Sequence, residues 1–95
     1  MAERTGERVP VEELLEFPTV YSFKAIGHHT REFSERCHRL AREALGGDRR
    51  VELRTRLSRQ GTYLSATLTA RIETAEELKE VYRVLRQVDG LITLL

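Results

Sequence analysis

Two runs of alternating apolar and polar residues lie on either side of a short turn, and no other feature constrains the fold as strongly. The first run covers residues 50–58, the second covers residues 63–72, and Arg59-Gln60-Gly61 lies in the turn between them. Alternation with a period of two places every second side chain on one face of a β-strand. The pattern therefore predicts an antiparallel hairpin whose two strands each have one apolar face.

Further elements flank this hairpin on both sides. Residues 19–27 alternate in the same way, whereas residues 29–45 and 74–88 have apolar residues at the three- and four-residue spacing of an amphipathic helix. Thr74 followed by Glu77 three residues later is the capping-box spacing, which predicts where the second helix begins. The apolar residues 91–95 after Gly90 predict a short final strand.

The order of these elements is strand, helix, strand, strand, helix, strand. Two helical stripes and one sheet face must bury one another, and right-handed crossovers leave few arrangements that achieve this. We expect an α+β fold, the ferredoxin-like split βαβ sandwich, with a four-stranded antiparallel sheet in the order 4-1-3-2 and two helices on one face. Residues 10–95 are assigned to this single domain and residues 1–9 to a flexible N-terminal tail. The predicted core consists of Phe23, Phe33, Leu40, Leu53, Leu68, Leu78, Val81 and Leu85.

Composition excludes several classes of protein. The chain has 95 residues, 16 basic and 15 acidic, so its formal net charge of +1 gives no long-range attraction to a polyanion. Its single cysteine excludes an internal disulfide, and no apolar run approaches the length of a membrane span. We expect one cytoplasmic domain without a membrane segment.

Two motifs then suggest a family. The run Leu14-Leu15-Glu16-Phe17-Pro18 precedes a first strand containing Lys24 and Gly27, and the hairpin carries Ser58, Gly61, Tyr63 and Ser65. With these residues and a short apolar final strand, the chain from Leu14 onwards resembles the YbeD-like family of small bacterial proteins of unknown function. The resemblance implies a ferredoxin-like fold similar to the ACT domains that regulate amino-acid enzymes. It also suggests a link to lipoate metabolism.

The chain does not show a catalytic or metal-binding pattern. Cys37 falls on the apolar stripe of the first helix, and its neighbour His38 lies about 100° away around the helix axis. The adjacent His28 and His29 point apart, so the three histidines and the cysteine do not form a ligand set. We therefore assign no catalytic residue, no metal ligand and no cofactor.

A ligand site is predicted from topology instead. In the expected fold, the turns after the first strand, within the hairpin and before the last strand lie at one end of the sheet, beside the positive N-terminus of the first helix. An alternative interpretation is that these are ordinary turns built from turn-forming residues. The candidate ligand-binding residues are Gly27, His28, His29, Ser58, Arg59, Gln60, Gly61, Tyr63 and Asp89.

The last strand also predicts an apolar patch. If Leu91 and Leu95 face the helices, Ile92 and Leu94 lie on the open sheet face beside Val20 and Ile26. Such a patch is normally covered or used. We favour a cover from the same chain, by Leu14, Leu15 and Phe17, over a second copy, so we expect a monomer or a weak homodimer.

The function predicted from these features is a non-catalytic, ACT-like regulatory or interaction domain that binds a protein partner or a small metabolite. The alternative is a nucleic-acid-binding module that uses the open sheet face. Lys24, Arg54, Arg56 and Arg71 could reach phosphates, but Tyr63 is the only aromatic residue expected there for stacking bases. We therefore do not expect a nucleic-acid partner.

Overall fold

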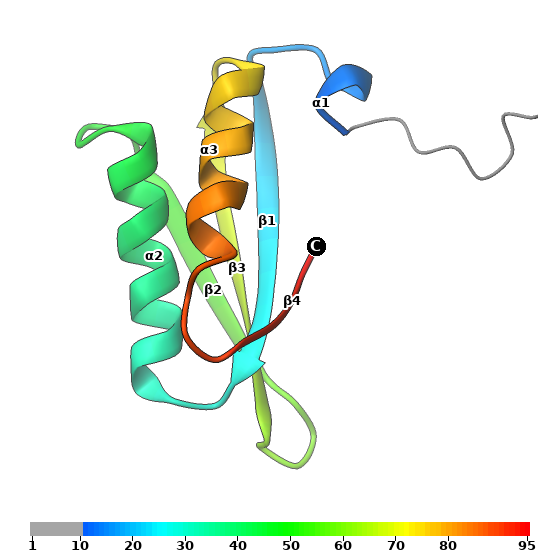
Figure 1. Ribbon diagram of the computed structural model, residues 1–95, viewed down its shortest axis with the longest axis vertical. Helices are drawn as coiled ribbons and strands as arrows, with labels where there is room; N and C mark the ends of the chain where they lie inside the picture. The colour runs from blue at the N-terminus through cyan, green and yellow to red at the C-terminus, as the bar shows by residue number, and fades with distance from the viewer. Residues whose placement is uncertain (1–10) are drawn as a thin grey trace, which may run out of the picture.

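The computed structural model describes residues 11–95 and consists of a sheet covered on one side by helices. After a four-residue helix α1 (Val11–Leu14), the elements are β1 (Thr19–His28), α2 (Arg31–Leu45), β2 (Val51–Leu57), β3 (Tyr63–Ile72), α3 (Ala75–Leu85) and β4 (Leu91–Leu94). Helices α2 and α3 both lie against the same face of the sheet (Figure 1), and no helix of residues 11–95 covers its other face, which we call the open face. The predicted α+β class is confirmed. The predicted tail, residues 1–9, lies outside the described residues.

The sheet is antiparallel throughout, with the order β2-β3-β1-β4. Counted from the other edge this reads 4-1-3-2, the order expected from the sequence. All ten residues of β1 pair with β3, from Thr19 opposite Ile72 to His28 opposite Tyr63. The two central strands thus form a long ladder that fixes the ends of the sheet.

Sixteen buried residues between the sheet and the two helices form the core. Six of the eight predicted core residues are at most 1% exposed, and Cys37 is fully buried among them. Leu40 and Leu53 are only partly buried, so the prediction was too broad for these two. Leu53 lies on the edge strand β2, where the helices cover the sheet less completely.

Side-chain caps fix where the two long helices begin. Thr30 accepts a hydrogen bond from the Phe33 amide at 3.2 Å, so α2 begins two residues later than the pattern predicts. Thr74 accepts from the Glu77 amide at 3.2 Å, as the capping-box spacing predicts. The carboxylate of Glu77 accepts from the Glu73 amide at 2.8 Å, one residue before the position that a capping box would use.

The side-chain directions predicted for the last strand were right for Leu91 but wrong for Leu94 and Leu95. Leu94 pairs with Ala25 and Thr93 with Ile26, but Leu91 pairs with Gly27, so a bulge at Ile92 shifts the alternation. Leu91 and Leu94 both pack against the core, whereas Leu95 remains 62% exposed. An extra residue in a five-residue apolar run leaves no signal in the sequence pattern, which explains the error.

The predicted cover of the open face is also wrong. Leu15 and Phe17 pack against the core, and α1 contacts α3 on the helix-covered side. Val20 on the open face is 66% exposed. Among the described residues, therefore, the first segment of the chain does not close over the sheet.

Candidate functional site

The three turns predicted to cluster do meet at one end of the sheet. The His28 amide donates to the carbonyl of Gly90 at 3.0 Å, which ties the end of β1 to the turn before β4. The His29 amide donates to the carbonyl of Thr62 at 3.2 Å, which ties the same segment to the β2–β3 hairpin. Figure 1 shows this end at the start of α2, with the hairpin projecting beyond the helices. We call it the turn end.

Gly27 is required where these segments approach. A Cβ atom at this position would lie 2.5 Å from two ring carbons of Phe33 and 2.7 Å from the carbonyl oxygen of Gly90. Neither neighbour can move easily, because Phe33 is 1% exposed and the Gly90 carbonyl accepts the His28 amide. The glycine is therefore explained by packing, without a ligand.

The hairpin is stabilised mainly by contacts within itself. The Ser58 hydroxyl accepts from the Tyr63 amide at 2.9 Å, and the Gly61 amide donates to the Ser58 carbonyl at 2.9 Å. Gly61 has a φ of 77°, a conformation that favours glycine in a turn. These contacts give Ser58 and Gly61 structural roles, whereas Arg59 and Gln60 are exposed.

The two histidines and Asp89 contact different partners. His29 donates from Nδ1 to the carbonyl of Gly61 at 3.1 Å, whereas the ring of His28 lies 6.2 Å from that of Tyr63. Asp89 is 4.0 Å from Arg36 of α2, and its side chain is 94% exposed. The nine predicted residues therefore share one end of the molecule but do not converge on a single point.

The turn end contains separate shallow cavities. One of about 420 Å³ lies at the start of α2, and one of about 350 Å³ lies on the open sheet face. The first is lined by His28, Thr30, Glu32, Arg36, Asp89 and Gly90. The second is lined by Lys24, Ile26, Arg56, Leu57, Ser58, Tyr63 and Ser65. A third, of about 220 Å³, lies beside the hairpin and includes Arg59 and Gln60.

Sequence reasoning missed a larger cavity, of about 680 Å³, at the opposite end of the sheet. Leu45 and the loop between α2 and β2, residues 46–50, form one wall. The rest comes from Glu52 of β2, residues 69–71 of β3 and Val20 of β1. Its arginines already have carboxylate partners: Arg50 lies 3.7 Å from Glu52, and Arg71 lies 2.9 Å from Glu73. The only sequence signal was the Gly46-Gly47 pair followed by two arginines.

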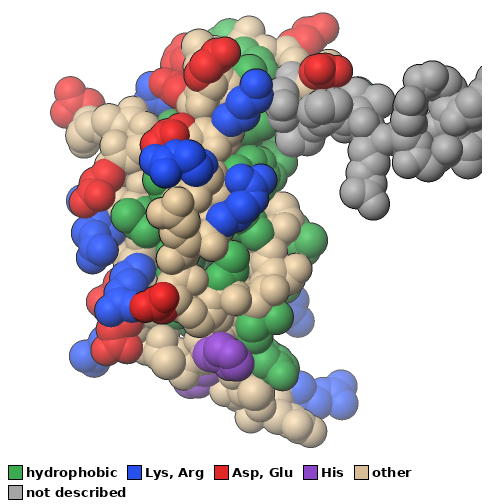
Figure 2. Space-filling model, viewed as in Figure 1, with side chains coloured by type: hydrophobic (Ala, Val, Ile, Leu, Met, Phe, Trp, Pro, Cys, Tyr) green, Lys and Arg blue, Asp and Glu red, His purple; other side chains and the backbone are tan. Residues whose placement is uncertain are grey.

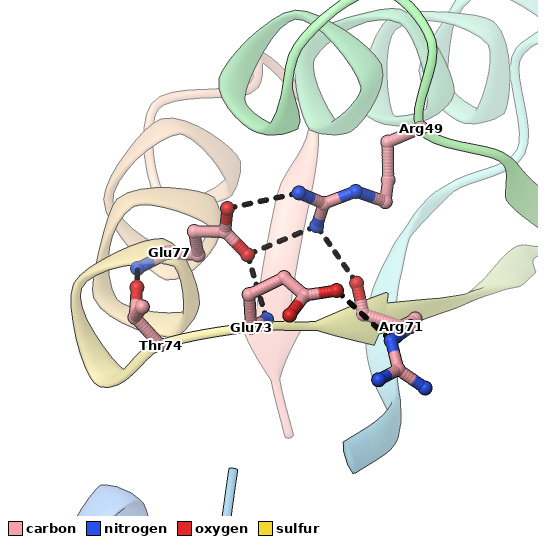
Figure 3. Close-up of polar contacts among 5 residues, drawn as sticks. All are labelled: Arg49, Arg71, Glu73, Thr74 and Glu77. Carbon is pink, nitrogen blue, oxygen red and sulfur yellow. Dashed lines mark hydrogen bonds and ion pairs between the residues drawn. The ribbon is translucent and has the colours of Figure 1, made fainter. Parts of the chain in front are cut away.

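Arg49 in this cavity binds Glu77 through both carboxylate oxygens, at 2.9 and 3.0 Å (Figure 3). It also donates to the carbonyl of Arg71 at 2.8 Å. The hydrogen bond from Arg49 holds the pKa of Glu77 below its ordinary value, despite the opposing effect of burial. A bidentate pair of this kind fixes the loop to the start of α3, which is a structural role.

The two most strongly shifted groups in the interior of the described chain, Cys37 and Tyr82, are both held protonated. Burial raises the pKa of Cys37 to about 11, so the thiol is protonated at neutral pH and is not a nucleophile. Burial also raises the pKa of Tyr82, whose hydroxyl lies 2.6 Å from that of Tyr21. Within the part of the chain that the structure describes, no three His, Cys, Asp or Glu side chains could jointly hold a metal ion. No described helix is long and apolar enough to cross a membrane.

Charges of the two signs are mixed over the helices. Figure 2 shows acidic and basic side chains side by side on the face covered by α2 and α3. Pairs such as Arg39 with Glu43 and Arg83 with Glu80 lie on these helices. This face therefore has no large region of a single sign.

Two solved structures, one of them an ACT domain, share this fold. The solution structure of protein HP0495 from Helicobacter pylori matches with a TM-score of 0.67 at 15% identity, over 96% of this chain and 92% of that one. The ACT domain from GTP pyrophosphokinase of Chlorobium tepidum matches with a TM-score of 0.56 at 13% identity, over 80% of this chain and 94% of that one. At these identities the likeness concerns the fold alone.

The sequence comparisons identify the family. A UPF0250 protein of Shewanella halifaxensis is 29% identical over 79 residues, which are 83% of this chain and 88% of that protein. A UPF0250 protein of Bordetella pertussis is 30% identical over 76 residues, 80% of this chain and 84% of that protein. The family model described as "Protein of unknown function (DUF493)" matches residues 12–95. The chain belongs to this family, which confirms the resemblance to the YbeD-like proteins.

Proposed function

We propose that this chain is a non-catalytic, cytoplasmic regulatory or interaction domain that binds a small metabolite or a protein partner at the turn end. The observation that carries the proposal is the meeting of three turns from distant parts of the sequence. Backbone hydrogen bonds from His28 and His29 hold these turns together, while polar side chains around them stay exposed. Binding groups are commonly found on loops that a rigid scaffold positions.

The ACT-like fold supports a regulatory rather than a catalytic role, by analogy of architecture. The one cysteine of the chain, Cys37, is buried, so a reaction that uses its thiol has no support. The nucleic-acid alternative has less support. Tyr63 is the only Phe or Tyr side chain that the described strands present on the open face, whereas single-strand binding normally uses several stacking aromatics.

An NMR titration tests the proposal. The ¹⁵N-labelled protein is titrated with amino acids, with lipoate and with inorganic phosphate, lipoate being included because the family resemblance suggests it. We expect at least one of these to shift the amide resonances of Gly27, Gly61 and Gly90 in a saturable way. If none of them does, the turn end does not bind these metabolites and that part of the proposal fails.

A further inference from the structure

The open sheet face carries basic side chains that have no acidic partner. Lys24 on β1 and Arg54 and Arg56 on β2 form no ion pair with any of the described residues. By contrast, Arg49 and Arg71 at the opposite end each bind a glutamate at 2.9 Å. Within the described part of the chain, therefore, no ion pair neutralises these three charges, although the backbone of Lys24 pairs with that of Leu95.

The register of the sheet brings these three side chains together. Lys24 and Arg54 both pair with Thr67 of β3, from its two sides. In the next row towards the turn end, Ile26 and Arg56 both pair with Ser65. Residues two strands apart are separated by about 10 Å, so long cationic side chains from β1 and β2 can reach one anionic group above β3.

A cavity of about 350 Å³ lies at this position and has the composition of an anion site. Lys24 and Arg56 supply the positive charge, and the lining residues include no carboxylate. Ser65 lies between them, and its hydroxyl makes only a 3.4 Å hydrogen bond, to the carbonyl of Arg56, which it can exchange for a better acceptor. Ile26, which pairs with Ser65, adds apolar surface on the same face.

The other large cavities are less suited to an anion. The cavity at the start of α2 includes Glu32 and Asp89 beside its single arginine. The cavity at the opposite end includes Asp48 and Glu52, and its arginines are paired. Charge therefore favours the cavity on the sheet face.

We propose that Lys24, Arg56 and Ser65 form a binding site for the carboxylate or phosphate group of a small anionic molecule, whose apolar part lies against Ile26. Arg54, one row further along β2, adds to the attraction. The inference rests on the proposed function in that it names the chemical class of the ligand. Of the cavities at the turn end, it selects the one on the sheet face rather than the one at the start of α2.

The test measures binding of inorganic phosphate and of citrate by amide shifts, in the full chain and in four variants. Lys24→Gln and Arg56→Gln each remove one positive charge from the site, and Arg36→Gln removes one from the cavity at the start of α2. Arg42→Gln is the matched control, because Arg42 is exposed on α2 and forms no ion pair with any residue of the described range. The amide spectrum of each variant also shows that it is folded.

We expect saturable shifts at the amides of Lys24, Arg56 and Ser65. Lys24→Gln and Arg56→Gln should each weaken binding about tenfold, the usual effect of losing one charged hydrogen bond. Arg42→Gln and Arg36→Gln should change the dissociation constant less than about twofold, because exposed charges at a distance are screened.

Other results would overturn the inference. Equal weakening by Arg42→Gln and Arg56→Gln would mean that the anions only screen the surface charge. Suppose instead that the anions shift the Gly90 amide, and that this shift disappears in Arg36→Gln but persists in Arg56→Gln. The proposed function would then stand, and the site on the sheet face would be refuted. Conversely, shifts at Ser65 without any at Gly27, Gly61 or Gly90 would support the sheet-face cavity and show that the three turns themselves do not contact the ligand.

Two further probes identify the source of the anionic group. Hexaglutamate stands for an acidic protein segment, and a ten-residue single strand of thymidine stands for a nucleic acid. If either binds at Lys24 and Arg56 at least about tenfold more tightly than citrate, a difference of about 1.4 kcal/mol, the site serves a macromolecule and the proposal of a small anion is wrong.

Discussion

Replacing Gly27 with alanine tests the packing at the turn end, because the structure predicts a clash on two sides. The added methyl group would lie 2.5 Å from two carbons of the Phe33 ring and 2.7 Å from the Gly90 oxygen. Carbon atoms in contact prefer a separation of about 3.5–4.0 Å, so roughly 1 Å of movement is needed. Either the buried ring must shift or β1 must move away from the turn before β4.

The size of the effect follows from two opposing contributions. Overpacking a filled core typically costs about 1–3 kcal/mol. Replacing glycine lowers the entropy of the unfolded chain and so offsets about 0.4–1 kcal/mol of this. We expect a net loss of about 1–2 kcal/mol, a substantial part of the roughly 5–15 kcal/mol that stabilises a typical domain. The melting temperature should fall by about 4–16 °C for a domain of this size.

Urea unfolding followed by circular dichroism measures this loss, with Gly47→Ala as the matched control. A Cβ at Gly47 would meet no heavy atom within 4 Å, so this variant should be unchanged or slightly more stable. A double-mutant cycle with Phe33→Leu isolates the contact with the ring, and we expect a coupling of at least about 0.5 kcal/mol. The reasoning is refuted if Gly27→Ala and Gly47→Ala unfold at the same urea concentration, or if the effects at Gly27 and Phe33 simply add.

Two further predictions concern stability. Leu68→Ala removes a fully buried side chain from the centre of β3 and should cost about 2–5 kcal/mol; an unchanged urea midpoint would contradict the register of that strand. Glu77→Gln breaks the bidentate pair with Arg49 and should cost about 1.5–3 kcal/mol at pH 7. In the folded state the pKa of Glu77 lies below its ordinary value of 4.5. The stability that this carboxylate contributes is therefore fully present above pH 4.5 and is lost as the pH falls through the lowered pKa. The difference in urea midpoint between the parent chain and Glu77→Gln should therefore shrink below pH 4.5, and a difference that stays constant down to pH 2 would contradict the assignment.

The fold could be predicted because nearly every element carries a local periodic signal. Residues 63–72 alternate without interruption, and the structure has β3 at the same bounds. The errors arise where a signal is short or depends on distant contacts. The bulge at Ile92 lies in a strand of four residues, and the packing of Leu15 and Phe17 against the core follows a helix of four residues. Neither segment is long enough for a period to be read.

The clustering of the turns could be predicted because topology alone places strand ends together. The contacts within those turns could not be predicted. The sequence does not show that the Ser58 hydroxyl accepts a hydrogen bond within the hairpin, or that the Phe33 ring leaves no room for a side chain at Gly27. The cavity at the opposite end was missed for a similar reason. Its walls come from three separate strands and a loop. The ion pair that fixes this loop joins Arg49 to Glu77, 28 positions along the chain, so no local pattern in the sequence indicates it.

Net charge was the least informative of the sequence measures. A value of +1 suggests a surface without attraction for anions, but it averages over the whole chain. Pairing on the helices and around the loop at residues 46–50 neutralises many of the charges locally. The side chains of Lys24, Arg54 and Arg56 have no such partner within residues 11–95, and the β-sheet register gathers them on one face. Because the field near a surface depends on how charges are arranged, a nearly neutral chain can still present a local site for an anion.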